Sequence, residues 1–242
     1  VRQPPDLIEN PRRRAALLLA GLLFASLALP FGVGRAQQQD VDLALILAVD
    51  CAYSVDSREY LLQMQGMAQA FLNPEVQAAV AEGERQRIAV AVLQWSDDRN
   101  QHLSLPWTII SSAEDARALA GQLAAMPRQL AEGGTSISAA LTAAEALLAL
   151  APPAARRVVD VSTDGRNNNG QPVPPVRDRL VAQGITINGL TILNDWPTLN
   201  LYFEQRVAGG EGHFVIPADD YEAYPQAILR KLLREVTGPG IS

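Results

Sequence analysis

The sequence predicts an α/β domain whose mostly parallel central sheet of about six strands has one antiparallel edge strand and helices on both faces. Apolar, strand-like segments alternate with helix-like segments along the chain, and this alternation is typical of a parallel sheet covered by crossover helices. Two neighbouring strand-like segments are joined by only about six residues. That connection is too short for a helical crossover, so we expect these two strands to pair antiparallel.

The first strand and the turn after it occupy residues 41–57. Residues 41–49 are nearly all Val, Leu, Ile and Ala, which is typical of a strand buried on both faces. Asp56 and Glu59 then have the spacing of a helix capping box, and apolar residues follow at helical intervals. These are Tyr60, Leu61, Met64, Met67, Ala68 and Phe71. The stretch LAVDCAYSVDS therefore runs from a strand into a helix.

The remaining elements follow from the same patterns. Residues 87–95 (RIAVAVLQW) are a second apolar strand, and residues 102–110 (HLSLPWTII) alternate enough to be the third. Trp95 and Trp107 fit packing within these two strands. The later predicted strands are 157–162, 185–193 and 213–216, and the later predicted helices are 113–125, 137–150, 175–183 and 221–236.

The first 36 residues have the pattern of an export signal. Three arginines, residues 12–14, precede an apolar run at residues 15–29, Pro30 ends this run, and a small-residue site ends at Ala36. The run is shorter than the roughly 20 residues that a membrane-spanning helix needs, which favours removal over retention as an anchor. We therefore predict an export signal at residues 1–36, one domain at residues 37–242, no stable membrane span after cleavage, and a periplasmic or extracellular location.

Charge and composition argue against several classes of function. Cleavage after Ala36 leaves 15 basic and 24 acidic residues, and a net charge of −9 disfavours binding to nucleic acid or anionic lipid. Cys51 is the only cysteine, so the chain forms no internal disulfide. His102 and His213 lie far apart in the sequence and lack the spacing of a zinc site.

Three polar loops stand out between these elements. They are DCAYS at residues 50–54, GGTSIS at residues 133–138 and STDG at residues 162–165. In open α/β sheets the ligand site lies beyond the carboxyl ends of the strands, near the point where the strand order reverses. We expect the three loops to meet there.

The three loops resemble the metal-ion-dependent adhesion site of the von Willebrand factor A (VWA) domain. The pattern of that site is Asp-x-Ser-x-Ser, a Thr in a later loop, and a final Asp-Gly. Asp50 matches the first Asp and Ser54 the second Ser, while Ala52 stands where the first Ser is expected. Thr135 matches the Thr, and Asp164 matches the last Asp. The resemblance covers residues 41–236 and implies the three-layer, Rossmann-like VWA fold.

A narrower resemblance is carried by five longer stretches. The sequence is similar to a family of exported bacterial proteins that contain a VWA-like domain and have no settled function. The stretches are RIAVAVLQWS, GGTSIS, RRVVDVSTDGRNNNG, GITINGLTILND and GGEGHFVIPADDYEAYPQAILRKLLRE.

The resemblance implies an exported module that binds a protein partner, and no enzyme. In the VWA family, residues at the four matching positions hold a divalent cation, Mg²⁺ or else Mn²⁺ or Ca²⁺, and an acidic side chain of the partner completes its coordination. Hydroxyl and carboxylate oxygens suit such hard cations, and Ala52 leaves room for a water in place of the missing hydroxyl. Two alternatives remain: a metal-independent interaction module of the same fold, and a metal-dependent hydrolase that uses the acidic site.

Each candidate residue also has a purely structural interpretation. Asp50 could satisfy the amides of its turn, and Thr135 could cap the helix that begins near residue 136. The three asparagines at residues 167–169 could form a polar loop or a rim that selects partners. Arg58 lies one residue too late for the Cys-x5-Arg loop of a phosphatase. Cys51 follows a strand buried on both faces, so we expect it to pack into the core as a small apolar residue.

Overall fold

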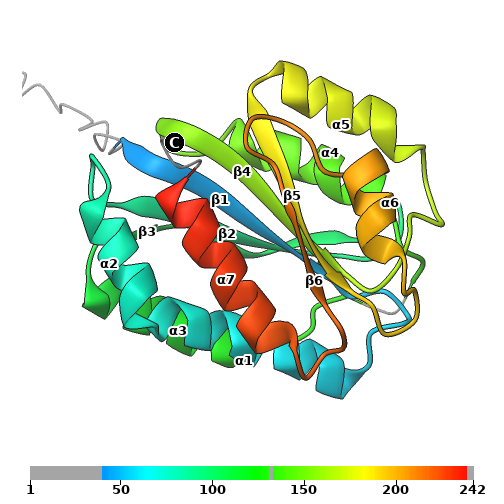
Figure 1. Ribbon diagram of the computed structural model, residues 1–242, viewed down its shortest axis with the longest axis horizontal. Coiled ribbons are helices and arrows are strands. Elements are labelled where there is room, and N and C mark those ends of the chain that lie inside the picture. The colour runs from blue at the N-terminus through cyan, green and yellow to red at the C-terminus, as the bar shows by residue number, and fades with distance from the viewer. Residues whose placement is uncertain (1–39, 131–132, 239–242) are drawn as a thin grey trace, which may run out of the picture. The chain divides into compact units, whose positions relative to one another are not determined.

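The central sheet has six strands in the order β3-β2-β1-β4-β5-β6 (Figure 1). They are β1 (Val41–Asp50), β2 (Ile88–Trp95), β3 (Gln101–Ile110), β4 (Ala154–Thr163), β5 (Ile185–Ile192) and β6 (Val215–Ala218). Every neighbouring pair is parallel except β2 and β3, so the predicted fold class and its antiparallel edge strand are confirmed. This computed structural model describes residues 40–130 and 133–238, so the predicted export signal at residues 1–36 lies outside the described residues.

Helices cover both faces of the sheet (Figure 1). One face carries α1 (Ser57–Leu72), α2 (Pro74–Glu82), α3 (Ala113–Ala124) and α7 (Tyr224–Thr237). The other face carries α4 (Ile137–Leu148), α5 (Val173–Ala182) and α6 (Leu199–Arg206). Within residues 40–130 and 133–238, no helix combines the length and the apolar character that crossing a membrane requires.

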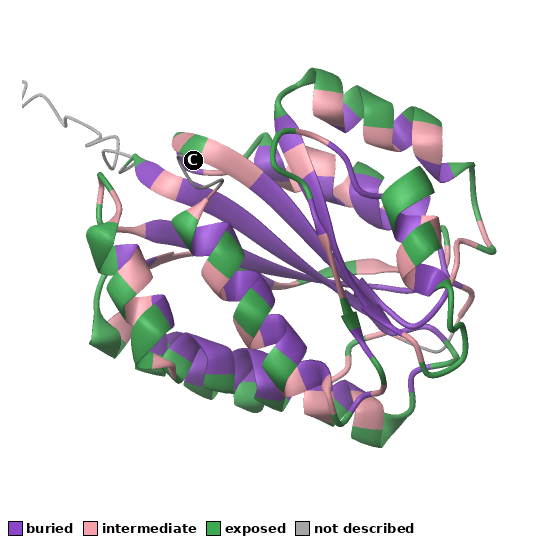
Figure 2. Cartoon of the chain, viewed as in Figure 1, coloured by how far each residue is buried: buried purple, intermediate pink, exposed green. Residues whose placement is uncertain are grey.

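Strand β1 is buried on both of its faces, as its apolar run predicts. Leu43 and Leu45 join the core that α1 and α7 cover, whereas Ala44 and Ile46 join the core that α4 and α5 cover. Burial of each Leu or Ile side chain contributes about 2 kcal/mol. Figure 2 shows the central strands buried along most of their length. The two cores therefore fix the position of the residue at the end of the strand, Asp50.

Strand β1 also lies where the strand order reverses. The chain leaves β1 for β2 on one side, and β4 later pairs with β1 on the other side. In the register between β1 and β4, Val49 lies opposite Ser162, so the next residues, Asp50 and Thr163, end the two strands side by side. The loops after β1 and β4 therefore flank the crevice in which α/β sheets bind ligands.

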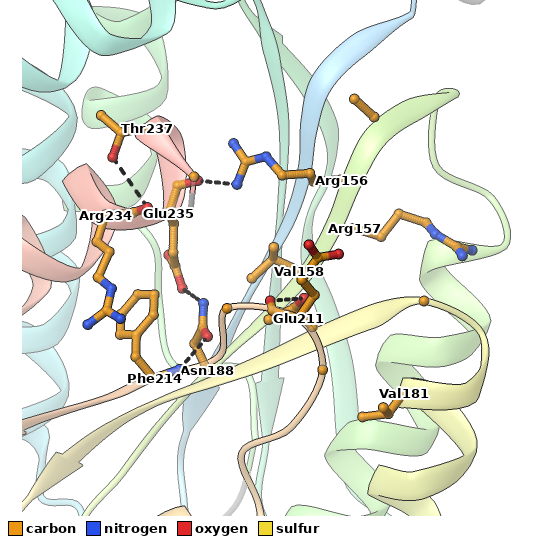
Figure 3. A pocket seen from close by; sticks show the side chains of 16 residues that line it. Arg156, Arg157, Val158, Val181, Asn188, Glu211, Phe214, Arg234, Glu235 and Thr237 are labelled. Carbon is orange, nitrogen blue, oxygen red and sulfur yellow. Dashed lines mark hydrogen bonds between the residues drawn. The ribbon is translucent and has the colours of Figure 1, made fainter. Parts of the chain in front are cut away.

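Helix α7 is fastened to the sheet by buried charges. Lys231 Nζ lies 2.8 Å from Asp160 Oδ1 of β4 and 2.6 Å from Glu235 Oε1 of its own helix. Asn188 of β5 donates a hydrogen bond of 2.9 Å to the same Glu235 oxygen (Figure 3). At the end of α7, the Arg156 guanidinium donates to two helix carbonyl oxygens. The last helix and the sheet therefore share one polar network.

Some predicted boundaries were wrong, and two helices were not predicted. Helices α2 and α6 have 9 and 8 residues, too few turns to give a clear helical period. Strand β6 begins at Val215 instead of residue 213. Helix α7 begins at Tyr224 instead of residue 221, with Pro225 in its first turn, where proline is favoured.

Candidate metal centre

Asp50, at the end of β1, is fully buried and links two strands. Its Oδ1 accepts a hydrogen bond of 2.7 Å from the Ala52 N–H, which is the turn amide that the structural interpretation expects. Its Oδ2 accepts a hydrogen bond of 2.5 Å from Thr163 Oγ1, at the end of β4. The same hydroxyl accepts the Gly165 N–H at 2.9 Å. Asp50 therefore holds the loops after β1 and β4 together.

Asp164 contacts the first loop directly. Ser54 Oγ donates a hydrogen bond of 2.7 Å to Asp164 Oδ1, although 110 residues separate the two in sequence. The other carboxylate oxygen, Asp164 Oδ2, is buried and makes no hydrogen bond of normal geometry with the described residues, although the buried Tyr221 hydroxyl lies close enough to act on this carboxyl group. A buried carboxylate oxygen without a partner is costly, so this atom favours a ligand that supplies positive charge.

Thr135 lies against the Asp164 loop. A Cβ added at Gly165 would come within 3.1 Å of Thr135 Oγ1, so the absence of a side chain at Gly165 allows this close approach. Ser136 is the N-cap of α4, so Thr135 does not have the capping role that its structural interpretation gave it. Thr135 is buried, and its hydroxyl forms no hydrogen bond with the described residues. The hydroxyl oxygen is therefore free to serve as a ligand.

The buried carboxyl groups of Asp50 and Asp164 interact, and both have raised pKa values. Burial, and then the nearby charge of Asp164, raises the pKa of Asp50 to about 7. Burial likewise raises the pKa of Asp164. A divalent cation between these groups would offset both effects, because it favours the ionised form of each carboxyl.

The residues present fit a hard cation. The four matching positions offer two carboxylates and two hydroxyls, all of them oxygen donors. In residues 40–130 and 133–238, no group of three or more His, Cys, Asp and Glu side chains could hold a metal ion. A cation at this site would therefore depend on hydroxyl groups and water as well as on the two acids.

Ala52 is buried within the first loop, with 1% of its surface exposed. Arg128 holds that loop, because its guanidinium donates to the carbonyl oxygens of Cys51 at 2.7 Å, Ala52 at 3.1 Å and Val55 at 2.9 Å. Arg128 and Thr163 are site-forming residues that the sequence reasoning missed. Thr163 directly precedes Asp164 in the STDG loop, whereas no local signal marks Arg128.

The asparagine loop supports the candidate site from outside. Asn167 Oδ1 accepts the Ser138 N–H at 3.1 Å and so caps the first turn of α4, whose own N-cap side chain makes no such bond. Asn168 Oδ1 accepts the Thr135 N–H at 2.9 Å, and Asn169 Oδ1 accepts an N–H at 2.9 Å from residue 98. These internal contacts favour the polar-loop interpretation over a rim that selects partners.

Cys51 packs into the core that α1 and α7 cover, as expected. Its Sγ lies 3.7 Å from Gln94 Oε1. Burial raises the pKa of the thiol to about 12, so the thiolate needed for nucleophilic attack is scarce at neutral pH.

The arrangement of strands, helices and the three loops is the VWA fold, and solved structures with this fold match the chain. The mussel byssus proximal thread matrix protein 1, with a zinc-occupied MIDAS (metal-ion-dependent adhesion site) motif, aligns with a TM-score of 0.64 and 19% identity over 82% of this chain and 48% of that chain. The von Willebrand factor type A protein from Catenulispora acidiphila aligns with a TM-score of 0.58 and 14% identity over 85% and 49% of the two chains. The chain thus spans about half the length of these two proteins.

A third structure is matched over almost its whole length. The vWF domain of the type V pili tip protein Mfa5 from Porphyromonas gingivalis aligns with a TM-score of 0.53 and 12% identity over 84% of this chain and 98% of that chain. Residues 40–240 match the family described as "Protein of unknown function (DUF1194)", and the chain belongs to this family. No curated protein sequence matches the chain.

Proposed function

We propose that the protein is an exported VWA module that binds a protein partner through a divalent cation, Mg²⁺ or else Mn²⁺ or Ca²⁺. The observation that carries the proposal is the buried, unpartnered Asp164 Oδ2. It lies in the loop whose Gly165 packs against the free hydroxyl of Thr135. Ser54 and Asp50 complete the set of oxygen donors at the same edge of the sheet.

Each residue of the set has a separate task. Asp50 fixes the turn after β1 and ties it to β4 through Thr163. Ser54 holds Asp164 in place through one carboxylate oxygen and leaves the other oxygen for the cation. A bound cation supplies an open coordination position for a carboxylate of the partner. The module works by binding, and we propose no catalytic role for it.

Proteins of similar fold support this proposal by their own roles. A matrix protein of the mussel byssus carries a zinc-occupied MIDAS motif. The pilus adhesin SpaC from Lactobacillus rhamnosus GG and the pili tip protein Mfa5 also contain this fold. Matrix, adhesin and pilus proteins act outside the cytoplasm by binding other molecules, which is the setting that we propose for this chain.

Calorimetric titration with Mg²⁺ and Mn²⁺ tests the cation site. We expect the unchanged protein to bind, and Asp164→Asn to lose binding at least tenfold, because the variant keeps the shape of the side chain and removes its charge. Asp40→Asn is the matched control, since Asp40 is exposed and directly precedes β1, at the opposite end of the strand from Asp50. Absence of binding by the unchanged protein, or equal binding by Asp164→Asn, would contradict the proposal.

A metal-independent interaction module is the second candidate. Ala52 supplies no hydroxyl, and both Asp50 oxygens already accept hydrogen bonds from the protein. Partner capture that is indifferent to a chelator and to Asp164→Asn would favour this second function.

A further inference from the structure

A second pocket, of about 620 Å³, lies beside the candidate cation site. It is formed by the loop after β4, the start of α5 and one side of α6. Arg166 and Arg206 supply its charges, and none of the lining residues that the structure describes is acidic. Leu201, Val173 and Tyr202 provide an apolar wall. A basic pocket is notable in a chain whose net charge is −6.

Within residues 40–130 and 133–238, the two arginines have no carboxylate partner. Among the described residues, neither Arg166 nor Arg206 forms an ion pair. Arg166 donates to Thr198 Oγ1 at 2.8 Å, while its Nε is buried without a hydrogen-bond partner. Arg206 is exposed at the end of α6. Both guanidinium groups therefore retain donors for an anionic ligand.

Aromatic rings hold the first of these arginines in place. The Arg166 guanidinium carbon lies 4.9 Å from the ring centroid of Trp196 and 5.6 Å from that of Tyr202. Trp196 is 47% exposed, an unusual state for so large an apolar side chain. Trp, Tyr and Arg are the residue types that dominate binding energy at protein interfaces.

The pocket and the candidate cation site share one loop. Arg166 follows Asp164 by two residues in the loop after β4. Asp195, directly before Trp196, acts electrostatically on Asp164 from the loop after β5. A peptide segment bound at the cation site would therefore pass close to the pocket.

We propose that this pocket binds a second acidic side chain of the protein partner, next to the acid bound at the cation site. The inference rests on the proposed function, because it specifies the partner of the same surface. A planar guanidinium matches the two oxygens of a carboxylate, and the apolar wall suits an aliphatic or proline residue beside that acid. The partner segment is therefore acidic and partly apolar, with at least two acids.

The exposed tryptophan provides a direct readout by NMR. The chain has three tryptophans, of which Trp95 is fully buried and Trp107 Nε1 donates to a main-chain carbonyl oxygen. The sample is the protein from residue 37 onward, because these residues form one compact unit. The titration follows the indole N–H signal of Trp196. The probe is the blocked peptide Asp-Pro-Glu, with Asn-Pro-Gln as its neutral counterpart and inorganic phosphate as a comparison anion.

We expect a saturable shift of the Trp196 signal with the acidic peptide and no such shift with the neutral peptide. Arg206→Gln, which leaves the contact between Arg166 and Trp196 intact, should weaken binding at least tenfold, as should Arg166→Gln. Arg230→Gln, an exposed change on α7, is the matched control and should bind like the unchanged protein.

The proposal would be overturned by the absence of a shift, by Arg206→Gln and Arg166→Gln binding the peptide as tightly as the unchanged protein, or by phosphate binding as tightly as the peptide. The titration is repeated with EDTA. If the Trp196 shift persists in EDTA, the peptide binds the pocket without a cation. The pocket would then be supported even if the protein proved to bind no cation. A shift that EDTA abolishes assigns the peptide to the cation site alone and also contradicts the pocket.

Discussion

At the scale of single residues, position 52 limits the number of ligands for a cation. The Ala52 N–H donates to Asp50, its carbonyl oxygen accepts from Arg128, and its methyl group is buried. Both backbone groups of Ala52 thus form hydrogen bonds within the first loop, and the residue lacks only a side-chain oxygen. Restoring that oxygen should therefore strengthen cation binding without rebuilding the loop.

Ala52→Ser is predicted to tighten Mg²⁺ binding roughly tenfold, or about 1.4 kcal/mol, because a hydroxyl replaces one water ligand. Calorimetric titration measures the change. Ala52→Gly is the control, since it alters the side chain without adding an oxygen and should not tighten binding. Equal affinities for the Ser and Gly variants would show that position 52 does not face the cation.

The candidate site was only partly predictable from its residues. Asp50, Ser54 and Asp164 were found because short motifs in the sequence mark them, and hydrogen bonds link their loops as expected. Arg128 was missed because its contacts with the first loop join residues more than 70 positions apart, which no local pattern records. Of the two interpretations of Thr135, the structure removes the capping one, because the neighbouring Ser136 takes that position.

At the scale of elements, the start of α4 depends on a side chain from another loop. The side chain of Ser136, the N-cap, makes no capping hydrogen bond, and Asn167 instead accepts one from the Ser138 N–H. The helix therefore begins correctly only when the loop after β4 is in place. This contact couples the helix to the loop that carries Asp164.

Asn167→Ala is predicted to lower the free energy of unfolding by about 1 kcal/mol, the usual cost of losing a helix cap. Urea unfolding followed by circular dichroism measures this change. Asn194→Ala, in the exposed loop after β5, is the control and should cost much less. If both variants lose the same stability, the proposed external cap contributes nothing specific.

The attachment of α7 predicts a dependence of stability on pH. Asp160 and Glu235 are two buried acids that share a single buried lysine, Lys231, with Tyr224 close by. Burial raises the pKa of Asp160 to about 7, Lys231 opposes this shift, and the charge of Glu235 adds to it. The folded protein therefore keeps a proton that the unfolded chain releases near pH 4.

Between about pH 4 and pH 7 the folded state binds more protons, so the free energy of unfolding should fall as the pH rises. Asp160→Asn removes one titrating group and should make this slope shallower by up to about 1.4 kcal/mol per pH unit. Urea unfolding at pH 5, 6 and 7 measures both slopes. Identical slopes would contradict a proton held within this cluster. Asp50, whose pKa burial also raises to about 7, contributes equally to both proteins and cancels in the comparison.

The long elements were predictable, and the short ones were not. The apolar run of β1 and the capping box of α1 are local signals, and both are present in the structure. Helices α2 and α6 owe their stability to packing against the rest of the domain, because each buries few residues and has little helical pattern. Such elements become visible only when the whole fold is known.

At the scale of the whole molecule, the sheet brings together loops that are far apart in the sequence. The order of the strands places β1 between β2 and β4, so the loops carrying Asp50 and Asp164 meet at one edge. Two cores hold this edge from opposite faces. The basic pocket at Arg166 borders the same edge. One face of the domain thus combines a candidate cation site with a candidate anion site, as expected for a surface that binds a protein.

Capture of partners from the cell envelope tests the central claim, cation-dependent protein binding, most directly. The immobilised protein is incubated with envelope extract in Mg²⁺ or in EDTA, beside Asp164→Asn and the Asp40→Asn control. We predict that the unchanged protein and the control retain a partner in Mg²⁺ and release it in EDTA, while Asp164→Asn retains none. Capture that is equal in Mg²⁺ and EDTA, and equal for Asp164→Asn, would contradict the account.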